Sequence, residues 1–224
     1  MPDAGMTNRL SRRIELAELR PSATYRDIHL ACLQAERHGL CAAVVHPVHC
    51  ERAVTHLRGS NIPVVAAVGF PTGAFTIEGK AAEARDAIAR GASEIEYVVN
   101  VGALRSGNRA LVAREMDAMR DATRGHVLKA TLESSLLTDE EKSAACRLAS
   151  DAGVDFVVTS TGFVETRPAV EDVRVLKEAA GVCVLAAGDI RTLEVARELL
   201  NAGASRLRTS NAILVAGERA EEDA

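Results

Sequence analysis

A single lysine interrupts an apolar run in the middle of this chain, where its charge would have to be buried. The segment Val-Leu-Lys-Ala-Thr-Leu-Glu (127–133) predicts a β-strand. Side chains alternate across a strand, so Lys129 and Glu133 share one face, as Glu96 and Asn100 do at the preceding predicted strand. Because a buried ammonium needs a carboxylate partner, we expect Lys129 to pair with Glu96 or Glu133 inside the fold.

Such a pair has three possible roles. It can be a structural ion pair, it can move protons as an acid/base pair, or Lys129 can form a Schiff base with a carbonyl substrate. A Schiff base requires an amine that is partly neutral near pH 7. Carboxylate partners raise the pKa of a lysine, so acid/base work by Glu96 and Lys129 is favoured over an imine. The remaining lysines, Lys80, Lys142 and Lys177, fall in segments of helical period and are expected on solvated faces.

Two kinds of segment alternate along the chain, and they predict the strands and helices that position these residues. Short runs rich in Val, Ile and Ala are followed by longer Ala/Leu/Arg/Glu segments of helical period, which predicts a parallel sheet with crossover helices. The predicted strands are 14–16, 41–46, 63–68, 94–99, 127–132, 156–159, 183–187 and 206–209. The predicted helices are 24–38, 76–90, 109–122, 139–152, 169–179 and 193–201.

Eight strands in about 200 residues predict one (β/α)8 TIM barrel, an α/β fold. An open doubly wound sheet is the alternative, but no GxGxxG follows the first strand. We expect the barrel at 14–216, an N-terminal extension at 1–13 and a frayed tail at 217–224.

Barrel active sites lie at the carboxyl ends of the strands, so residues there are the candidates for the site. His46 ends the second predicted strand and can act as a catalytic acid or base, or cap the strand by hydrogen bonding. No HxH or HxxxH spacing occurs, and we expect no metal and no cofactor. The candidates for substrate binding are Glu15, Asn100, Glu133, Thr161, Gly188, Arg191, Arg208, Ser210 and Asn211.

Four segments resemble the deoxyribose-phosphate aldolase family, in the same order and spacing from about residue 14 to residue 214. They are Val-Gly-Phe-Pro-Thr-Gly-Ala (68–74), Val-Val-Asn-Val-Gly-Ala-Leu (98–104), Leu-Lys-Ala-Thr-Leu-Glu (128–133) and Thr-Ser-Thr-Gly-Phe (159–163). The resemblance implies a TIM barrel and aldolase chemistry on a small carbonyl substrate.

The chain departs from the family pattern at the residues that carry its chemistry. The family forms a Schiff base on a lysine directly before the Thr-Ser-Thr-Gly motif, and Val158 occupies that position. Leu185 stands where the family has a second lysine that tunes the first. The resemblance also implies Asp on the fourth strand, where the chain has Glu96, and Asp-His-Thr on the first, where it has Glu-Leu-Ala (15–17).

The phosphate-binding loops implied by the resemblance are altered as well. Gly188, Thr209 and Ser210 remain, but Asp189 replaces a glycine, and its charge would repel a phosphate. Arg208 replaces another glycine and would attract one, so the sequence leaves phosphate binding open.

Together these features favour a repurposed aldolase-like enzyme. It would form or cleave a C–C bond, dehydrate or cyclise a carbonyl compound through an enol, without a lysine at position 158. One alternative is a catalytically inactive protein that binds a metabolite or a protein partner. A second is an aldolase whose Schiff base has moved to Lys129.

Composition limits the partners and location of the protein. Hydrophobic residues make up 47% of the 224 residues and aromatics 3%, which suits a core of Ala, Val, Leu and Ile around a parallel sheet. The net charge of −4 is spread without a basic stripe, so no nucleic-acid partner is expected. No run approaches the roughly 20 apolar residues of a membrane span, and no signal peptide is predicted. We expect a cytoplasmic protein, compatible with a homodimer, whose five cysteines are buried hydrophobes.

Overall fold

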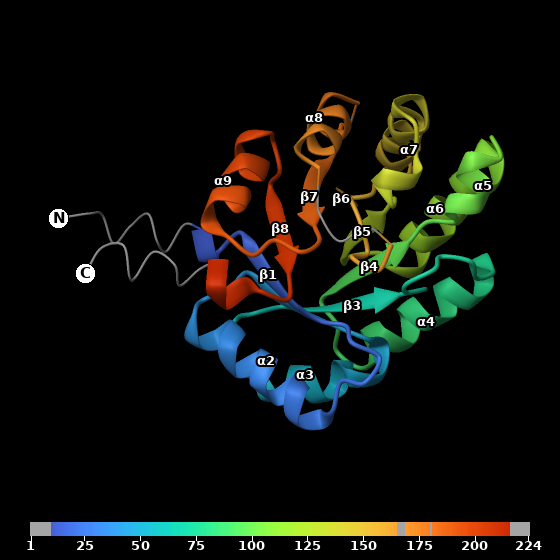
Figure 1. Cartoon of the computed structure of the whole chain (residues 1–224). Helices are drawn as coiled ribbons and strands as arrows, with labels where there is room; N and C mark the ends of the chain where they lie inside the picture. Colours follow the sequence, from blue (N-terminus) through green and yellow to red (C-terminus); the bar gives the residue numbers. More distant parts are fainter. Residues whose placement is uncertain (1–9, 165–168, 180, 216–224) are drawn as a thin grey trace.

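Eight parallel strands close into a barrel in the order of the sequence (Figure 1). The computed structural model describes residues 10–164, 169–179 and 181–215. This confirms the expected TIM barrel. The predicted N-terminal extension, except residues 10–13, and the predicted tail lie outside the described residues. The strands are β1 (Ile14–Glu18), β2 (Ala42–Val45), β3 (Val64–Val68), β4 (Glu94–Val98), β5 (Val127–Thr131), β6 (Phe156–Val158), β7 (Cys183–Ala187) and β8 (Arg206–Thr209).

Helices surround the barrel on its outside (Figure 1). They are α2 (Tyr25–Arg37), α3 (Cys50–His56), α4 (Ile77–Ala89), α5 (Val101–Arg105), α6 (Arg109–Ala122), α7 (Asp139–Asp151), α8 (Val170–Ala179) and α9 (Leu193–Asn201), with 3-10 turns at Pro47–His49 and Ser134–Leu136. Capping boxes begin α2 and α7, at Thr24 with Asp27 and at Thr138 with Glu141. The sequence did not predict α3 and α5, because helices of seven and five residues are too short to show a period.

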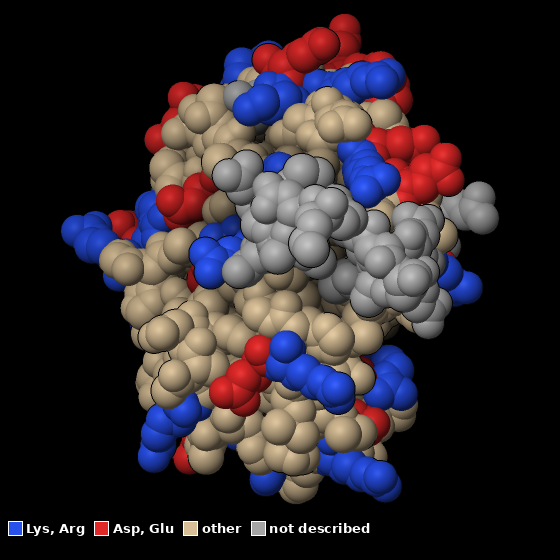
Figure 2. Space-filling view, turned by 90° about the vertical axis from the view of Figure 1, so that its left-hand side faces the viewer, with Lys and Arg blue, Asp and Glu red and all other residues tan. Residues whose placement is uncertain are grey.

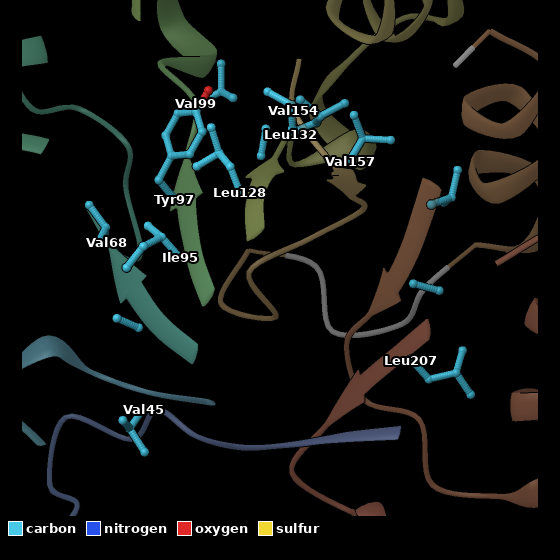
Figure 3. Packing of buried hydrophobic residues seen from close by; sticks show 14 of the residues in the cluster. Val45, Val68, Ile95, Tyr97, Val99, Leu128, Leu132, Val154, Val157 and Leu207 are labelled. Atoms are coloured by element: carbon cyan, nitrogen blue, oxygen red, sulfur yellow. The ribbon is translucent and has the colours of Figure 1, made fainter. Parts of the chain in front are cut away.

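The strands bury their two faces differently. Outward side chains such as Ile95, Leu128 and Leu207 are fully buried in the main core between sheet and helices (Figure 3). Inward side chains of β2 and β3 form a small apolar wall, and those of β6 and β7 form another. Charged side chains from β1, β4, β5 and β8 fill the rest of the interior.

Two of the helix lysines are buried, which corrects the expectation of solvated faces. Lys80 on α4 is 0% exposed; its Nζ donates to Glu115 Oε1 on α6 at 2.6 Å and to the Val98 carbonyl at 2.7 Å. Lys142 on α7 lies between Asp139 and Asp172 and is 7% exposed. Helical period alone did not reveal that these long side chains reach acids on neighbouring helices.

The outer surface carries both signs of charge. On the face in Figure 2, Lys and Arg side chains are interspersed with Asp and Glu among the coloured residues. Within the described part of the chain, no helix is long and apolar enough to cross a membrane.

Candidate active site

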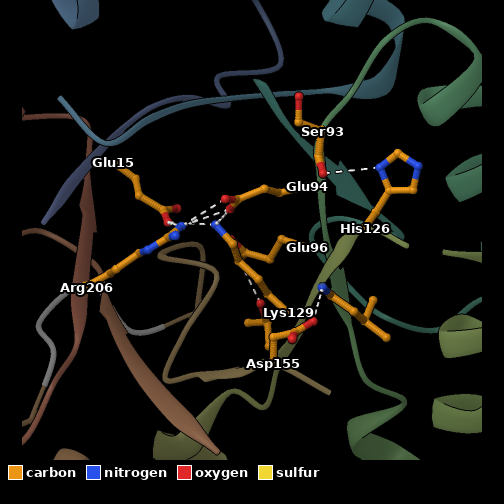
Figure 4. A network of polar contacts seen from close by, with 10 residues as sticks. Glu15, Ser93, Glu94, Glu96, His126, Lys129, Asp155 and Arg206 are labelled. Atoms are coloured by element: carbon orange, nitrogen blue, oxygen red, sulfur yellow. Dashed lines mark hydrogen bonds and ion pairs between the residues drawn. The ribbon is translucent and has the colours of Figure 1, made fainter. Parts of the chain in front are cut away.

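Lys129 lies at the centre of a buried ionic cluster (Figure 4). Its Nζ is 2.6 Å from Glu15 Oε1 and 2.7 Å from Glu94 Oε2, and Arg206 Nη1 contacts the same two carboxylates at 3.1 and 2.9 Å. Burial would lower the pKa of Lys129, but the carboxylates of Glu15, Glu94 and Glu96 outweigh it and raise that pKa. The ammonium is therefore held in its charged form.

This arrangement corrects the expected partners of Lys129. Lys129 and Glu96 both point into the barrel and are 0% exposed, and their Cα atoms are register partners on β5 and β4. The lysine nevertheless contacts Glu94, two residues earlier on β4, because its long side chain extends toward the amino ends of the strands. Glu133, the other expected partner, binds elsewhere.

Glu96 belongs to a second group of polar residues nearer the barrel mouth. Its Oε1 accepts from Thr131 Oγ1 at 2.7 Å and lies 3.3 Å from Arg208 Nη2, while Oε2 has no partner. Burial raises the pKa of Glu96, and the cations of Arg208 and Lys129 oppose this only in part. The carboxyl therefore keeps its proton to a higher pH than an exposed glutamate does.

Arg208 connects this second group to a pocket of about 370 Å³. The guanidinium donates from Nη2 to the Ser160 carbonyl and lies 5.5 Å from the centre of the Phe70 ring. The pocket lies at the loops that follow β1, β6, β7 and β8. Its lining residues are Ala17, Glu18, Leu19, Arg20, Pro21, Thr161, Gly162, Phe163, Gly188, Asp189, Arg191, Arg208, Thr209 and Ser210.

The pocket includes only some of the candidates from the sequence. Thr161, Gly188, Arg191, Arg208 and Ser210 line it. The candidates that do not line it are Glu15, His46, Glu96, Asn100, Lys129, Glu133 and Asn211. The structure thus separates the interior acids and lysine from the open pocket, with Arg208 between them.

Three of the candidates outside the pocket hold the local backbone. His46 Nε2 donates to the Leu19 carbonyl, directly after β1, at 3.0 Å. Asn100 caps α5, since its Oδ1 accepts from the Ala103 amide at 2.9 Å. Glu133, in a left-handed conformation with φ 52°, accepts from the Thr161 amide at 2.6 Å through Oε1. This contact ties the loop after β5 to the loop after β6.

The rim charges are paired locally. Asp189 Oδ1 accepts from Arg191 Nε at 2.7 Å and from Asn211 Nδ2 at 3.0 Å. On the other side, Arg20 Nε donates to Glu18 Oε1 at 2.9 Å. Asn211, which does not line the pocket, therefore helps to orient the carboxylate of Asp189.

Sequence reasoning did not name Glu94 and Arg206 as members of the interior cluster. Both were detectable by their spacing, because Glu94 lies two residues before Glu96 and Arg206 two before Arg208, which places each pair on one face of its strand. Their contact with Lys129 and Glu15 depends on closure of the barrel, which strand period does not specify.

An apolar pair occupies the interior between β6 and β7. Val158 and Leu185 are register partners, both 0% exposed, and pack with Ala187 and Phe156. Neither lines the pocket. These side chains offer no nucleophile and no proton donor.

Comparison with known proteins identifies the family of the chain. A family model described as DeoC/LacD family aldolase matches residues 3–212. The chain belongs to this aldolase family. A deoxyribose-phosphate aldolase of Brevibacillus brevis is 42% identical over 208 residues, covering 92% of this chain and 94% of that protein. One of Streptococcus sanguinis is 41% identical over 218 residues, covering 96% and 99%.

Solved structures of aldolases have the same fold. The tetrameric deoxyribose phosphate aldolase of Aeropyrum pernix superposes with a TM-score of 0.91 at 29% identity, covering 97% of this chain and 94% of that one. An aldolase called QR15 gives 0.90 at 33% identity, covering 96% and 97%. Among the described residues of this aldolase-family chain, no group of three or more His, Cys, Asp and Glu is arranged to hold a metal ion.

Proposed function

We propose that this protein is an aldolase-family lyase that makes or breaks a C–C bond beside a carbonyl through an enol, without an imine at position 158. The observation that carries the proposal is the closed apolar pair of Val158 and Leu185, both 0% exposed, at the positions where the resemblance places the family lysines. An alkyl side chain cannot form a Schiff base. The amine of Lys129 lies 5.9 Å from the ring of Phe156, which packs against this pair.

Lys129 is not a replacement for the absent amine. A Schiff-base lysine must lose its proton near neutral pH, whereas the pKa of Lys129 is raised by carboxylates that contact it at 2.6 and 2.7 Å. Lys129 also lies away from the pocket lining. We therefore assign it a structural role.

Glu96 is the group we propose for proton transfer. Because its pKa is raised by burial, it holds a proton for donation up to a higher pH than an exposed glutamate does. In the cleavage direction, Glu96 protonates the carbonyl oxygen of a β-hydroxy carbonyl compound. The C–C bond then breaks, its electron pair forms the enol, and the hydroxyl proton passes to the carboxylate of Glu96. A substrate oxygen must displace the single 3.3 Å contact between Glu96 and Arg208.

A second candidate function is metabolite binding without turnover. It is favoured by one observation, namely that neither Glu96 nor Lys129 lines the pocket in this structure. The experiment below separates the two functions.

The test combines trapping with hydrogen exchange. The protein is incubated with acetaldehyde and borohydride and its mass is measured; we expect no adduct. Exchange of the methyl protons of acetone in D2O is followed by NMR, and we expect exchange that Glu96→Gln abolishes and Glu36→Gln, on the exposed surface of α2, leaves unchanged.

Each other outcome would indicate a different function for this protein. An adduct on Lys129 would establish the relocated Schiff base and contradict the proposal. Absence of exchange in the unmodified protein, together with ligand binding, would favour the binding function. Substrates named for the relatives are a separate matter: we propose that deoxyribose 5-phosphate is not cleaved.

A further inference from the structure

Arg208 has more hydrogen-bonding capacity than its neighbours use. The residue is 2% exposed and lines the pocket. Within the described part of the chain, its polar contacts are to the Ser160 carbonyl and to Glu96, both through Nη2, and its buried Nε has no partner. A guanidinium presents five N–H donors in a planar fork, so a buried one with a free edge is costly unless a ligand completes it.

The charge of Arg208 is also poorly compensated. Arg20 and Arg191, on the pocket rim, each have a carboxylate within 3 Å, Glu18 and Asp189 respectively. Among the residues that the structure describes, the one carboxylate paired with Arg208 is that of Glu96, at 3.3 Å. Burial favours the protonated form of Glu96, and whenever Glu96 is protonated the guanidinium has no counter-charge among the described residues.

We propose that Arg208 is the specificity-determining residue of this pocket and binds the carboxylate of a small carbonyl compound. The proposal rests on the proposed function, because it names the substrate class of the same site. A planar guanidinium matches a carboxylate through two parallel hydrogen bonds. The pocket has apolar surface from Leu19, Pro21 and Phe163 for the remainder of a small substrate.

The same pocket disfavours a phosphate dianion. Asp189 lines it and is already paired with Arg191, so a bound phosphate dianion would face a carboxylate. A carboxylate carries a single charge and is satisfied by the one guanidinium.

Binding of a carboxylate has a consequence for Glu96. The groups that act on its charge are Arg208, Lys129 and Glu15, and Thr131 donates a hydrogen bond to it. When Arg208 forms hydrogen bonds to a bound carboxylate, its guanidinium stabilises the ionised form of Glu96 less. The complex should therefore take up a proton at Glu96, which places the general acid in its donating form as the substrate arrives.

The experiment compares pyruvate with pyruvamide, which has the same shape and no charge, by calorimetric titration of the full chain. We expect pyruvate to bind about tenfold to a hundredfold more tightly, the range for a charge-assisted contact. Arg208→Met should remove this preference, Arg208→Lys should retain part of it, and the control Arg124→Met, at an arginine outside the pocket whose side chain is 85% exposed, should leave it unchanged. Circular dichroism confirms that each variant is folded.

Two further measurements complete the test. Titration in buffers of different ionisation enthalpy should show proton uptake with pyruvate, absent in Glu96→Gln. Inorganic phosphate should compete weakly. Equal binding of pyruvate and pyruvamide, no pyruvate binding at all, or a preference that survives in folded Arg208→Met would overturn the proposal, as would phosphate binding as tight as that of pyruvate. Acetone exchange needs no carboxylate, so the proposed function can fail or hold independently of this result.

Discussion

Replacement of Lys129 by methionine tests whether this lysine is structural. The change keeps most of the side-chain volume and removes the ammonium between Glu15 and Glu94, residues that are 0% and 5% exposed. Arg206 still contacts both acids, at 3.1 and 2.9 Å. The variant therefore leaves two buried carboxylates with one cation in place of two.

The expected loss of stability follows from this count. Removal of one partner from a buried ion pair costs about 3–5 kcal/mol. Because Arg206 remains, we expect Lys129→Met to lower the free energy of unfolding by about 3 kcal/mol. Arg124→Met is the control: the side chains of Arg124 and of its partner Asp121 are 85% and 72% exposed, so we expect a loss of about 1 kcal/mol or less.

The difference in the free energy of unfolding between the parent protein and Lys129→Met should depend on pH in a defined direction. Burial would raise the pKa of Glu94, but Lys129 and Arg206 lower it, so its contribution is present above its ordinary pKa near 4.5 and is lost as pH falls. The pKa of Lys129 is raised, so its contribution persists below its ordinary pKa near 10.5 and is lost only as pH rises above that value. The loss caused by the mutation should be largest near pH 7 and shrink toward pH 4.

Urea denaturation of both variants and the parent at pH 7 and pH 4 measures these quantities. A loss below 1 kcal/mol at pH 7, or a loss that grows at pH 4, would refute the structural role of Lys129. It would indicate an amine that is neutral or free of its acids, as catalysis through an imine requires.

Four other predictions concern the interior, the substrate and the helices. Val158→Lys alone should trap little acetaldehyde with borohydride, whereas Val158→Lys with Leu185→Lys should give a label at residue 158 and lose about 3 kcal/mol or more of stability, since two cations are buried without partners; a folded double variant that traps nothing would show that the pocket has been reshaped. Purified protein should not cleave deoxyribose 5-phosphate in a coupled assay for glyceraldehyde 3-phosphate, and turnover that Lys129→Ala removes would contradict this. Lys80→Met should lower the unfolding free energy by about 3 kcal/mol in urea, because Glu115 stays buried without its cation; an unchanged unfolding free energy would contradict a stabilising role for this ion pair. Thr138→Ala should cost about 1 kcal/mol through loss of the α7 capping box, and no change in the melting temperature would argue against that cap.

The fold was largely predictable because local pattern and global architecture agree. All eight strands were expected, and β7, β8, α6 and α9 begin and end at the predicted residues. The burial of Lys129 was likewise predictable from the apolar run around it. Strand period specifies which face a side chain occupies and therefore sufficed for these statements.

Partners across the barrel were not predictable in this way. Glu15 lies 114 residues before Lys129, and their contact exists only because the barrel closes. Arg208 was expected at the mouth, but the reach of its side chain to Glu96 and Ser160 separates the acid from the pocket, and no pattern in the sequence indicates that. The positions of Val158 and Leu185 side by side follow from the register of β6 and β7.

The buried contact of Lys80 with Glu115 connects two outer helices, α4 and α6, to the loop after β4 at the barrel mouth. Glu115 Oε2 accepts a hydrogen bond from the Asn100 amide at 2.9 Å, and Lys80 Nζ donates one to the Val98 carbonyl. Side chains of α4 and α6 therefore fix the backbone of the turn that follows β4. Substitutions on α4 or α6 that move Lys80 or Glu115 can therefore shift the backbone that follows β4 at the barrel mouth. Directed-evolution libraries confined to pocket residues would miss this route, and libraries that vary 80 and 115 together would sample new mouth geometries on an unchanged barrel.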